Sequence, residues 1–197
     1  MFNNSKSRFI GFSDGIFAVI LTILVLDIVI PTNRNLLSQS WLKFGYSILI
    51  YIAGFSLVST YWFFHQKLFS SVKHIDGNLI MLNFYFLFFI SLMPILTRLI
   101  AANPLSHLNN FIYGMVYLIF NIYLWWLFKS VYKRQISTYD WSQSEIIEAK
   151  RIIRVVRGTV FVGIIACICS LIWGPLTPLI LAFSPAIREI KSRITNK

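Results

Sequence analysis

Apolar residues in this chain gather into long runs that short polar segments separate. A run of about 20 mainly apolar residues is long enough to cross the hydrocarbon core of a bilayer as a helix. The pattern therefore predicts an all-α membrane protein whose residues 1–197 form one domain with six transmembrane helices. These helices are predicted at about residues 8–30, 44–64, 79–97, 110–128, 158–173 and 176–187.

The C-terminal third of the pattern allows an alternative. The last two predicted helices are short, and Gly174-Pro175 separates them, so one long kinked helix would also fit the run. Before them, residues 129–157 are predicted to form a cytoplasmic loop. Within this loop, Ser142 followed by Glu145 has the spacing of a capping box and predicts an amphipathic helix that leads directly into the next span.

Composition supports the membrane class. The chain is 57% hydrophobic and only 13% charged, with a mean hydropathy of +0.69, which a soluble domain of this size could not bury. The net charge of +11 could indicate nucleic-acid binding, but flanking charge explains it better. With six spans, all Lys and Arg except Arg34, Lys43 and Arg98 fall on the side of both termini. The positive-inside rule then predicts a multi-pass protein of the cell membrane with both termini cytoplasmic and no nucleic-acid partner.

The first predicted helix carries unusual chemistry. Arg8, Ser13 and Asp14 stand at its entry, and Asp27 stands near its far end. Because ionisable groups within a membrane span are costly, they are candidates for a functional role, such as lining an ion pathway. Asp27 has two equally good interpretations. It could concentrate cations at an external mouth, or it could cap the helix or pair with a loop residue such as Arg34.

The polar entry of this helix needs partners if it is even partly buried. The candidates on other predicted helices are Trp62, His65 and Asn83. A hydrogen-bonded cluster of this kind would fix the rotation of the first helix about its own axis. The alternative for Asp14 alone is stabilisation of the first helical turn by the helix dipole.

An apolar stripe runs along the same helix. Val19, Ile23, Leu26 and Ile30 follow the spacing i, i+4, i+7 and i+11, so they share one face. Every face of this helix is apolar, so the periodicity alone equally allows the stripe to pack in the bundle or to face lipid.

The N-terminal half of the chain resembles the transmembrane protein 175 family of potassium channels, in its single-repeat prokaryotic form. The segment from Arg8 to about Thr97 carries the resemblance, whereas the later helices agree only in number and rough length. The matching motifs are Arg8-x-x-x-Phe12-Ser13-Asp14, Trp62-x-x-His65-x-x-Leu68-Phe69, Leu79-x-x-Leu82-Asn83 and Ser91-x-x-Pro94.

The resemblance implies an architecture and a set of roles. Family members are built of six-helix units whose first helix lines a central pore, and single-repeat members assemble as homotetramers. Carried over to this chain, a ring of Val19 forms the constriction, with further layers at Ile23 and Leu26. Val19 stands where the family more often has isoleucine or leucine, so the neck stays apolar and is slightly wider. Thr22 matches a position where some members carry a hydroxyl ring.

The resemblance also implies that Arg8, Ser13 and Asp14 form a polar network behind the pore with Trp62 and His65. The function we expect is passive, modestly potassium-selective cation transport through a hydrophobic constriction, with the potassium ion and the lipid bilayer as partners. An ion-coupled secondary transporter is the alternative. His65 with Asp76 or Asp14 could be drawn as an acid–base pair, but no nucleophile, metal or phosphate motif accompanies it. We therefore expect no enzyme activity, no cofactor and no metal other than permeating potassium.

Overall fold

The computed structural model describes residues 5–28, 30–31, 39–172, 177 and 180. These residues are helical apart from short connections, and five helical segments are long and apolar enough to cross a membrane. The sixth predicted helix, 176–187, lies outside the described residues except for two positions. The helices are α1 (Ser5–Val25), α2 (Gln39–Ser71), α3 (Gly77–Ser91), α4 (Met93–Ala102), α5 (His107–Thr138) and α6 (Gln143–Ile172).

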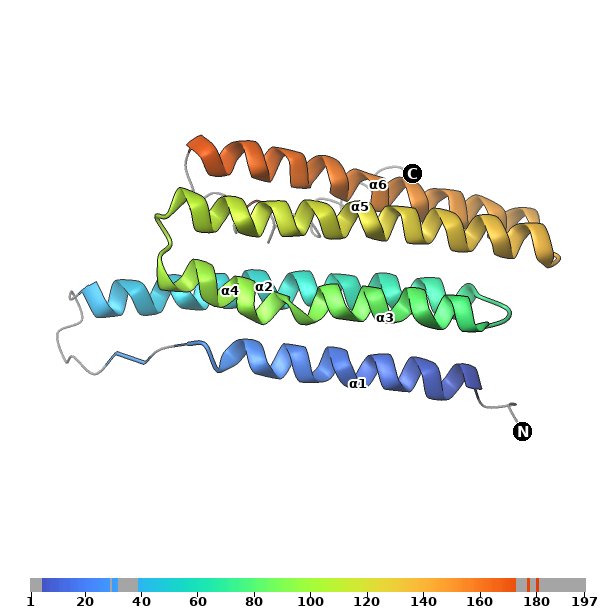
Figure 1. Cartoon of the computed structure of the whole chain (residues 1–197), viewed down its shortest axis with the longest axis horizontal. Coiled ribbons are helices and arrows are strands. Elements are labelled where there is room, and N and C mark those ends of the chain that lie inside the picture. Colours follow the sequence, from blue (N-terminus) through green and yellow to red (C-terminus); the bar gives the residue numbers. More distant parts are fainter. Residues whose placement is uncertain (1–4, 29, 32–38, 173–176, 178–179, 181–197) are drawn as a thin grey trace.

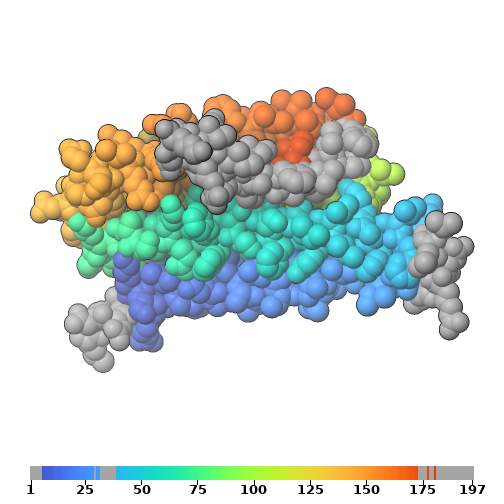
Figure 2. All heavy atoms as spheres, turned by 180° about the vertical axis from the view of Figure 1, so that it is seen from behind, coloured from blue at the N-terminus to red at the C-terminus, as the bar shows by residue number. Residues whose placement is uncertain are grey.

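The helices lie side by side in three layers, with their axes roughly parallel or antiparallel (Figure 1). α1 forms one outer layer, α2 with α3 and α4 forms the middle, and α5 with α6 forms the other outer layer. α1 packs against α2, α3 and α4, and the most extensive contact between two described helices is that of α5 with α6. Seen from behind, α1 again forms one edge of the bundle, next to α2 (Figure 2). The first helix is therefore a peripheral element of the subunit.

α1 ends earlier than the predicted boundary at residue 30. After Val25 the chain makes turns, with hydrogen bonds from Leu26 N to the Ile23 carbonyl and from Ile28 N to the Val25 carbonyl. Pro31 disfavours helical geometry at the residue before it, and branched residues such as Ile28 and Ile30 add little helix propensity. Over its 21 residues α1 still spans about 31 Å, enough for the hydrocarbon core.

The third span is one helix with a single break. α3 and α4 meet at Leu92, which keeps nearly helical dihedrals and donates to Phe89. The cause is Pro94, because proline lacks the N–H group that would bond one turn back. The Thr97 hydroxyl is bonded within α4, since it donates to the Pro94 carbonyl over 2.8 Å. The predicted span at 79–97 is thus extended to Gly77–Ala102.

Residues 129–138 continue α5 instead of forming a loop, which corrects that part of the prediction, whereas 143–157 form the first half of α6 and lead directly into its apolar segment, as predicted. Only 139–142 separate α5 from α6, because both helices continue past their apolar segments into charged sequence. Hydropathy marks the part of a helix that lies in lipid, whereas the two helices remain stable beyond it by packing on each other. The predicted capping box is confirmed: Ser142 Oγ accepts from Glu145 N over 3.3 Å, and Ser142 N donates to the Glu145 carboxylate over 2.7 Å.

Close approach between α5 and α6 depends on glycine. A Cβ atom added to Gly163 would lie 3.2 Å from the Leu118 Cα, and one added to Gly114 would lie 3.3 Å from the Cys167 sulfur. Such small residues let two helix backbones come together in a membrane, where van der Waals contact replaces the hydrophobic effect as a driving force. These contacts also fix the antiparallel register of α5 and α6.

The charges separate along the bundle. All described Lys and Arg residues except Lys43 and Arg98 lie toward the end that holds the start of α1 and the turns α2–α3 and α5–α6 (Figure 1). This is the asymmetry that orients membrane proteins, and it marks that end as the one predicted to be cytoplasmic.

Candidate functional site

α1 is the least buried of the five candidate spans. One of its faces is packed into the bundle through Ser13, Phe17, Ile20 and Leu24, which are at most 4% exposed. The opposite side is open. Its apolar side chains include Phe12, Val19, Ile23 and Leu26, and Val19 is 55% exposed.

The predicted constriction residues thus share one open surface of α1 and of the turn that follows it, which we call the α1 stripe (Phe12, Val19, Ile23 and Leu26). Beside it lies a hollow of about 550 Å³ between α1 and the α3–α4 break. Val19, Ile23 and Pro94 are among the residues that line this hollow. Thr22 is also exposed, and its hydroxyl donates to the Val19 carbonyl over 2.8 Å, so it is bonded to its own helix.

Small residues border the stripe. Gly11, Gly15, Ala18 and Thr22 recur at helical spacing, and all four are exposed. A Cβ atom added to Gly11 or Gly15 would meet nothing within 4 Å. A second helix could therefore approach this side of α1 closely.

A buried polar cluster holds the packed face of α1. Asn83 of α3 donates to Ser13 Oγ over 2.9 Å, and its carbonyl oxygen lies 2.9 Å from His65 Nε2 of α2. The three side chains are at most 1% exposed. Since a polar group in an apolar interior needs a partner, this cluster (Ser13, His65 and Asn83) fixes how α1 is rotated against α2 and α3.

A second polar cluster lies at the bundle surface one residue along α1. The Asp14 carboxylate accepts a hydrogen bond from the Trp62 indole over 2.9 Å and another from the Gln66 amide. The predicted network is therefore divided in two, with a buried part and a surface part. Asp14 is bound by neutral donors of α2.

Two members of the predicted network stand apart. Arg8 is exposed and has no hydrogen bond or ion pair with any residue that the structure describes. Phe12 belongs to the open stripe and makes an edge contact with Phe84 of α3, with ring centroids 5.8 Å apart. The structure does not bring Arg8 together with Ser13, Asp14 or His65.

Among the residues that the structure describes, Asp27 pairs with Arg98 of α4. Its carboxylate lies 2.8 Å from one guanidinium nitrogen and 2.9 Å from another, and its side chain is 14% exposed. Arg34 lies outside the described residues. The bond joins the end of α1 to α4, beside a hollow of about 370 Å³ that Lys43 also lines.

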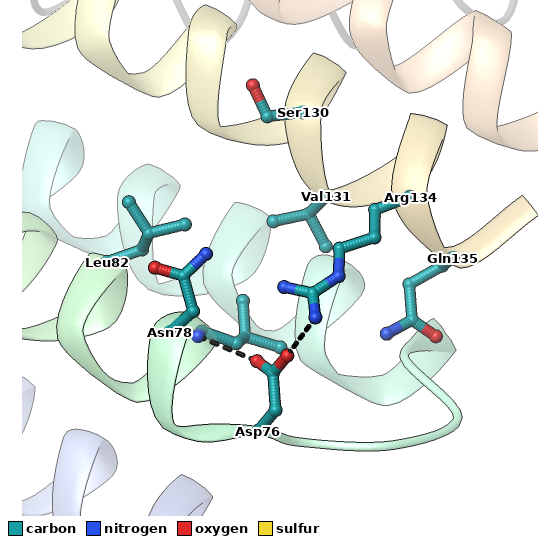
Figure 3. A pocket seen from close by; sticks show the side chains of 8 residues that line it. Asp76, Asn78, Leu82, Ser130, Val131, Arg134 and Gln135 are labelled. Carbon is teal, nitrogen blue, oxygen red and sulfur yellow. Dashed lines mark hydrogen bonds and ion pairs between the residues drawn. The ribbon is translucent and has the colours of Figure 1, made fainter. Parts of the chain in front are cut away.

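Asp76, the other carboxylate considered for acid–base chemistry, has a structural position. It caps α3 by accepting from Leu79 N over 2.9 Å, and it pairs with Arg134 of α5 (Figure 3). The adjoining hollow holds only about 70 Å³. Because His65 bonds to Asn83 and Asp76 bonds to Arg134, the two do not form the acid–base pair that an enzyme would need.

Two residues of these clusters were missed by sequence reasoning. Gln66 lies one helical turn after Trp62, a spacing at which both side chains can reach one partner, so a helical wheel of α2 contained the signal. Arg98 was assigned to a link after the third helix. Its position within α4 became visible only because the helix continues beyond Pro94.

Sequence comparison shows that this region is similar to a known family. Residues 8–94, which include both polar clusters and the α1 stripe, match the family described as the endosomal/lysosomal potassium channel TMEM175. A relative from Chryseobacterium sp. (strain P1-3), named a potassium channel, is 37% identical over 107 residues, covering 52% of this chain and 55% of that protein. A Danio rerio relative, named an endosomal/lysosomal proton channel, is 30% identical over 116 residues, covering 54% of this chain and 22% of that protein.

Structural comparison extends the likeness beyond residues 8–94. The structure of a lysosomal potassium-selective channel TMEM175 homolog from Chamaesiphon minutus superposes with a TM-score of 0.81 at 22% identity, covering 96% of this chain and 99% of that one. The two chains therefore share a fold. The sequence resemblance predicted from the motifs is confirmed over residues 8–94.

Proposed function

We propose that this chain, a TMEM175-family sequence over residues 8–94, forms a potassium-permeable channel whose pore is lined by α1. The observation that carries the proposal is the α1 stripe. α1 lies at the edge of the bundle, its polar side is turned inward by Ser13, His65 and Asn83, and its apolar side chains are left open. A helix held in one rotation can present the same residues to a pore in every subunit.

The open side of α1 suits assembly around an axis. Bulky residues of the stripe would face that axis, while Gly11, Gly15 and Ala18 beside them would let the α1 helices of neighbouring subunits approach. The hollow of about 550 Å³ next to the stripe offers room for side chains of a second copy. We infer a homotetramer, the state that the family resemblance implies.

Selectivity would come from the size and dryness of the neck. Four copies of Val19, with layers of Ile23 and Leu26, make an apolar constriction that blocks ions by dewetting when narrow and conducts when it opens slightly. Potassium releases its hydration water more readily than sodium, so partial dehydration favours potassium modestly. A Thr22 hydroxyl, freed from the Val19 carbonyl, could replace part of the lost hydration.

Asp27 is a weaker candidate for the external mouth than its charge suggests. Arg98 neutralises it, so the pair would attract cations less than a free carboxylate. We propose that it anchors the outer end of α1 to α4. The charge asymmetry of the bundle supports a cell-membrane protein with its N-terminus cytoplasmic.

Flux from liposomes tests this function. The purified protein, reconstituted in vesicles, is given an outward potassium gradient with pH and sodium equal on both sides, and then a matched sodium gradient. We expect potassium flux without any second ion gradient and slower sodium flux. Protein-free vesicles made from the same lipid give the baseline.

The same assay distinguishes the channel from an ion-coupled secondary transporter. Potassium movement that appears only when a proton or sodium gradient is added would identify a coupled transporter and overturn the channel. If protein shown by gel filtration to be folded and tetrameric gives no potassium flux with or without the second ion gradient, both the channel and the transporter are overturned.

A further inference from the structure

The exposed face of α6 changes from basic to apolar partway along the helix. Its buried face, which includes Ile152, Val156, Thr159 and Gly163, packs on the bundle. Side chains on the opposite side recur at helical spacing and share one exposed face. In order along the chain, this face presents Lys150, Arg154, Arg157, Phe161, Ile164, Ile165 and Ile168.

The three cations on this face are not balanced by acidic side chains. Lys150, Arg154 and Arg157 form no ion pair within the part of the chain that the structure describes. The two acidic residues of α6 are occupied elsewhere, since Glu145 bonds to Ser142 in the capping box and Glu148 pairs with Lys67 of α2 over 3.6 Å. The face therefore presents uncompensated positive charge.

The position of the change coincides with the level of an exposed tryptophan on α5. The contacts Gly114–Cys167 and Leu118–Gly163 set the antiparallel register, which brings Trp126 of α5 about level with Val155 of α6. Trp126 is half exposed, and tryptophan prefers the level of the lipid headgroups. The basic part of the α6 face thus lies at headgroup depth, and Phe161 and the isoleucines lie at the depth of the acyl chains.

α6 itself lies on the opposite side of the subunit from α1 (Figure 1). In an assembly built around α1, α6 would be at the perimeter, where it meets lipid. Charge and depth together select one class of ligand, because a phosphate-bearing headgroup complements the cations while its acyl chains cover the apolar half of the same face.

We propose that the α6 face (Lys150, Arg154, Arg157, Phe161, Ile164, Ile165 and Ile168) binds an anionic phospholipid. The guanidinium groups of Arg154 and Arg157 donate to the headgroup phosphate, and Lys150 adds a more distant charge. Phe161 and Ile165 contact the acyl chains. Binding at this face involves neither the α1 stripe nor the buried polar cluster, so it is independent of ion conduction.

Delipidated protein in a neutral detergent tests the proposal by thermal unfolding. Dioleoyl phosphatidylglycerol is titrated, with dioleoyl phosphatidylcholine as the zwitterionic comparison. We expect phosphatidylglycerol to raise the Tm by roughly 5 °C at a hundredfold excess over its Kd, and phosphatidylcholine to leave it nearly unchanged. Removing two charges with Arg154→Gln/Arg157→Gln should weaken binding about 30-fold, because each basic residue near an anionic surface contributes a factor of about five.

The matched control is Lys129→Gln/Lys133→Gln, which removes two exposed charges from α5 instead. Retention of phosphatidylglycerol binding in this control and its loss in the α6 variant supports the proposal. Equal loss in both variants would show a response to net charge and would overturn the site. Full competition by glycerol phosphate, which has no acyl chains, would also overturn it by showing a phosphate site rather than a lipid site.

Discussion

Asn83 donates a hydrogen bond to Ser13 over 2.9 Å, and this bond joins α3 to α1 at a point where both side chains are fully buried. The position of this hydrogen bond within α1 matters more for the orientation of the helix than the strength of the bond. Ser13 is followed by Asp14, which is held by α2, so two consecutive residues tie α1 to two different helices. The rotation of α1 is thereby set, and with it the direction of the α1 stripe.

Replacing Asn83 tests this anchoring. Asn83→Leu keeps the branched shape of the side chain but removes the donor to Ser13 Oγ, which retains its bond to the Phe9 carbonyl, and leaves His65 Nε2 without its partner. Unpartnered buried groups cost about 1–3 kcal/mol in soluble proteins, whereas hydrogen bonds between membrane helices average about 0.6 kcal/mol. We therefore expect a loss of about 1–2 kcal/mol, seen as a Tm lower by roughly 3–6 °C in detergent.

Asn78→Leu is the matched control for this experiment, since Asn78 is exposed on the same helix. It should change the Tm by less than about 2 °C, as surface substitutions usually do. A similar fall in Tm for Asn78→Leu and Asn83→Leu would contradict the anchoring role of Asn83.

Asp14 and Arg8 belong to the same sequence motif, but the structure predicts different effects for them. Asp14→Ala removes the acceptor of the Trp62 and Gln66 donors, so stability should fall by about 0.5–1 kcal/mol at this partly exposed site. Arg8→Ala removes a side chain without a partner among the described residues, so the subunit should unfold at an unchanged temperature. Equal losses in Tm for the two variants would contradict the separation of Arg8 from the surface cluster.

How far the sequence anticipates the structure differs between these residues. The pairing of Ser13 with Asn83 and of Asp14 with Trp62 was within reach, because polar side chains inside apolar spans have few possible partners. The same reasoning does not apply to Arg8. It stands at the membrane boundary, where water satisfies a charge, so burial gives no reason for a partner.

Helix lengths show the same limit. The apolar runs located the five described spans, but α5 and α6 continue through residues 129–157, which composition alone describes as polar. Their stability there comes from tertiary packing, on which hydropathy carries no information. The pairing of Asp27, just after the end of α1, likewise involves Arg98, a residue more than 70 positions away that hydropathy does not connect to it.

Gly15 offers a test of assembly that leaves the subunit intact. A side chain at this position meets nothing within 4 Å in the subunit, so Gly15→Leu should fold at least as stably as the wild type. If α1 helices meet along Gly11 and Gly15, the leucine should separate them and convert most of the tetramer to smaller species. Mass photometry or gel filtration with light scattering measures this change.

Gly158→Leu provides the control for that variant, because Gly158 is also exposed and has nothing within 4 Å of an added Cβ, but it lies on α6. It should leave the oligomeric state unchanged. A tetramer that persists in Gly15→Leu would remove the small-residue side of α1 from the subunit interface.

Substitution of Val19 is the most direct test of the channel proposal. An asparagine ring would hold water in the neck, so Val19→Asn should remove the barrier that dewetting creates, raise the sodium flux several-fold and bring the potassium-to-sodium permeability ratio toward one. Val25→Asn makes the same chemical change on the same helix, at a valine that is 45% exposed against 55% for Val19 but is turned about 120° around the axis. If α1 lines the pore with the α1 stripe, the reversal potential under a potassium–sodium gradient should shift for Val19→Asn and stay near the wild-type value for Val25→Asn. A reversal potential that shifts for Val25→Asn but not for Val19→Asn would mean that the Val25 side of α1 faces the pore. Unchanged reversal potentials in both variants would place the selective constriction outside α1.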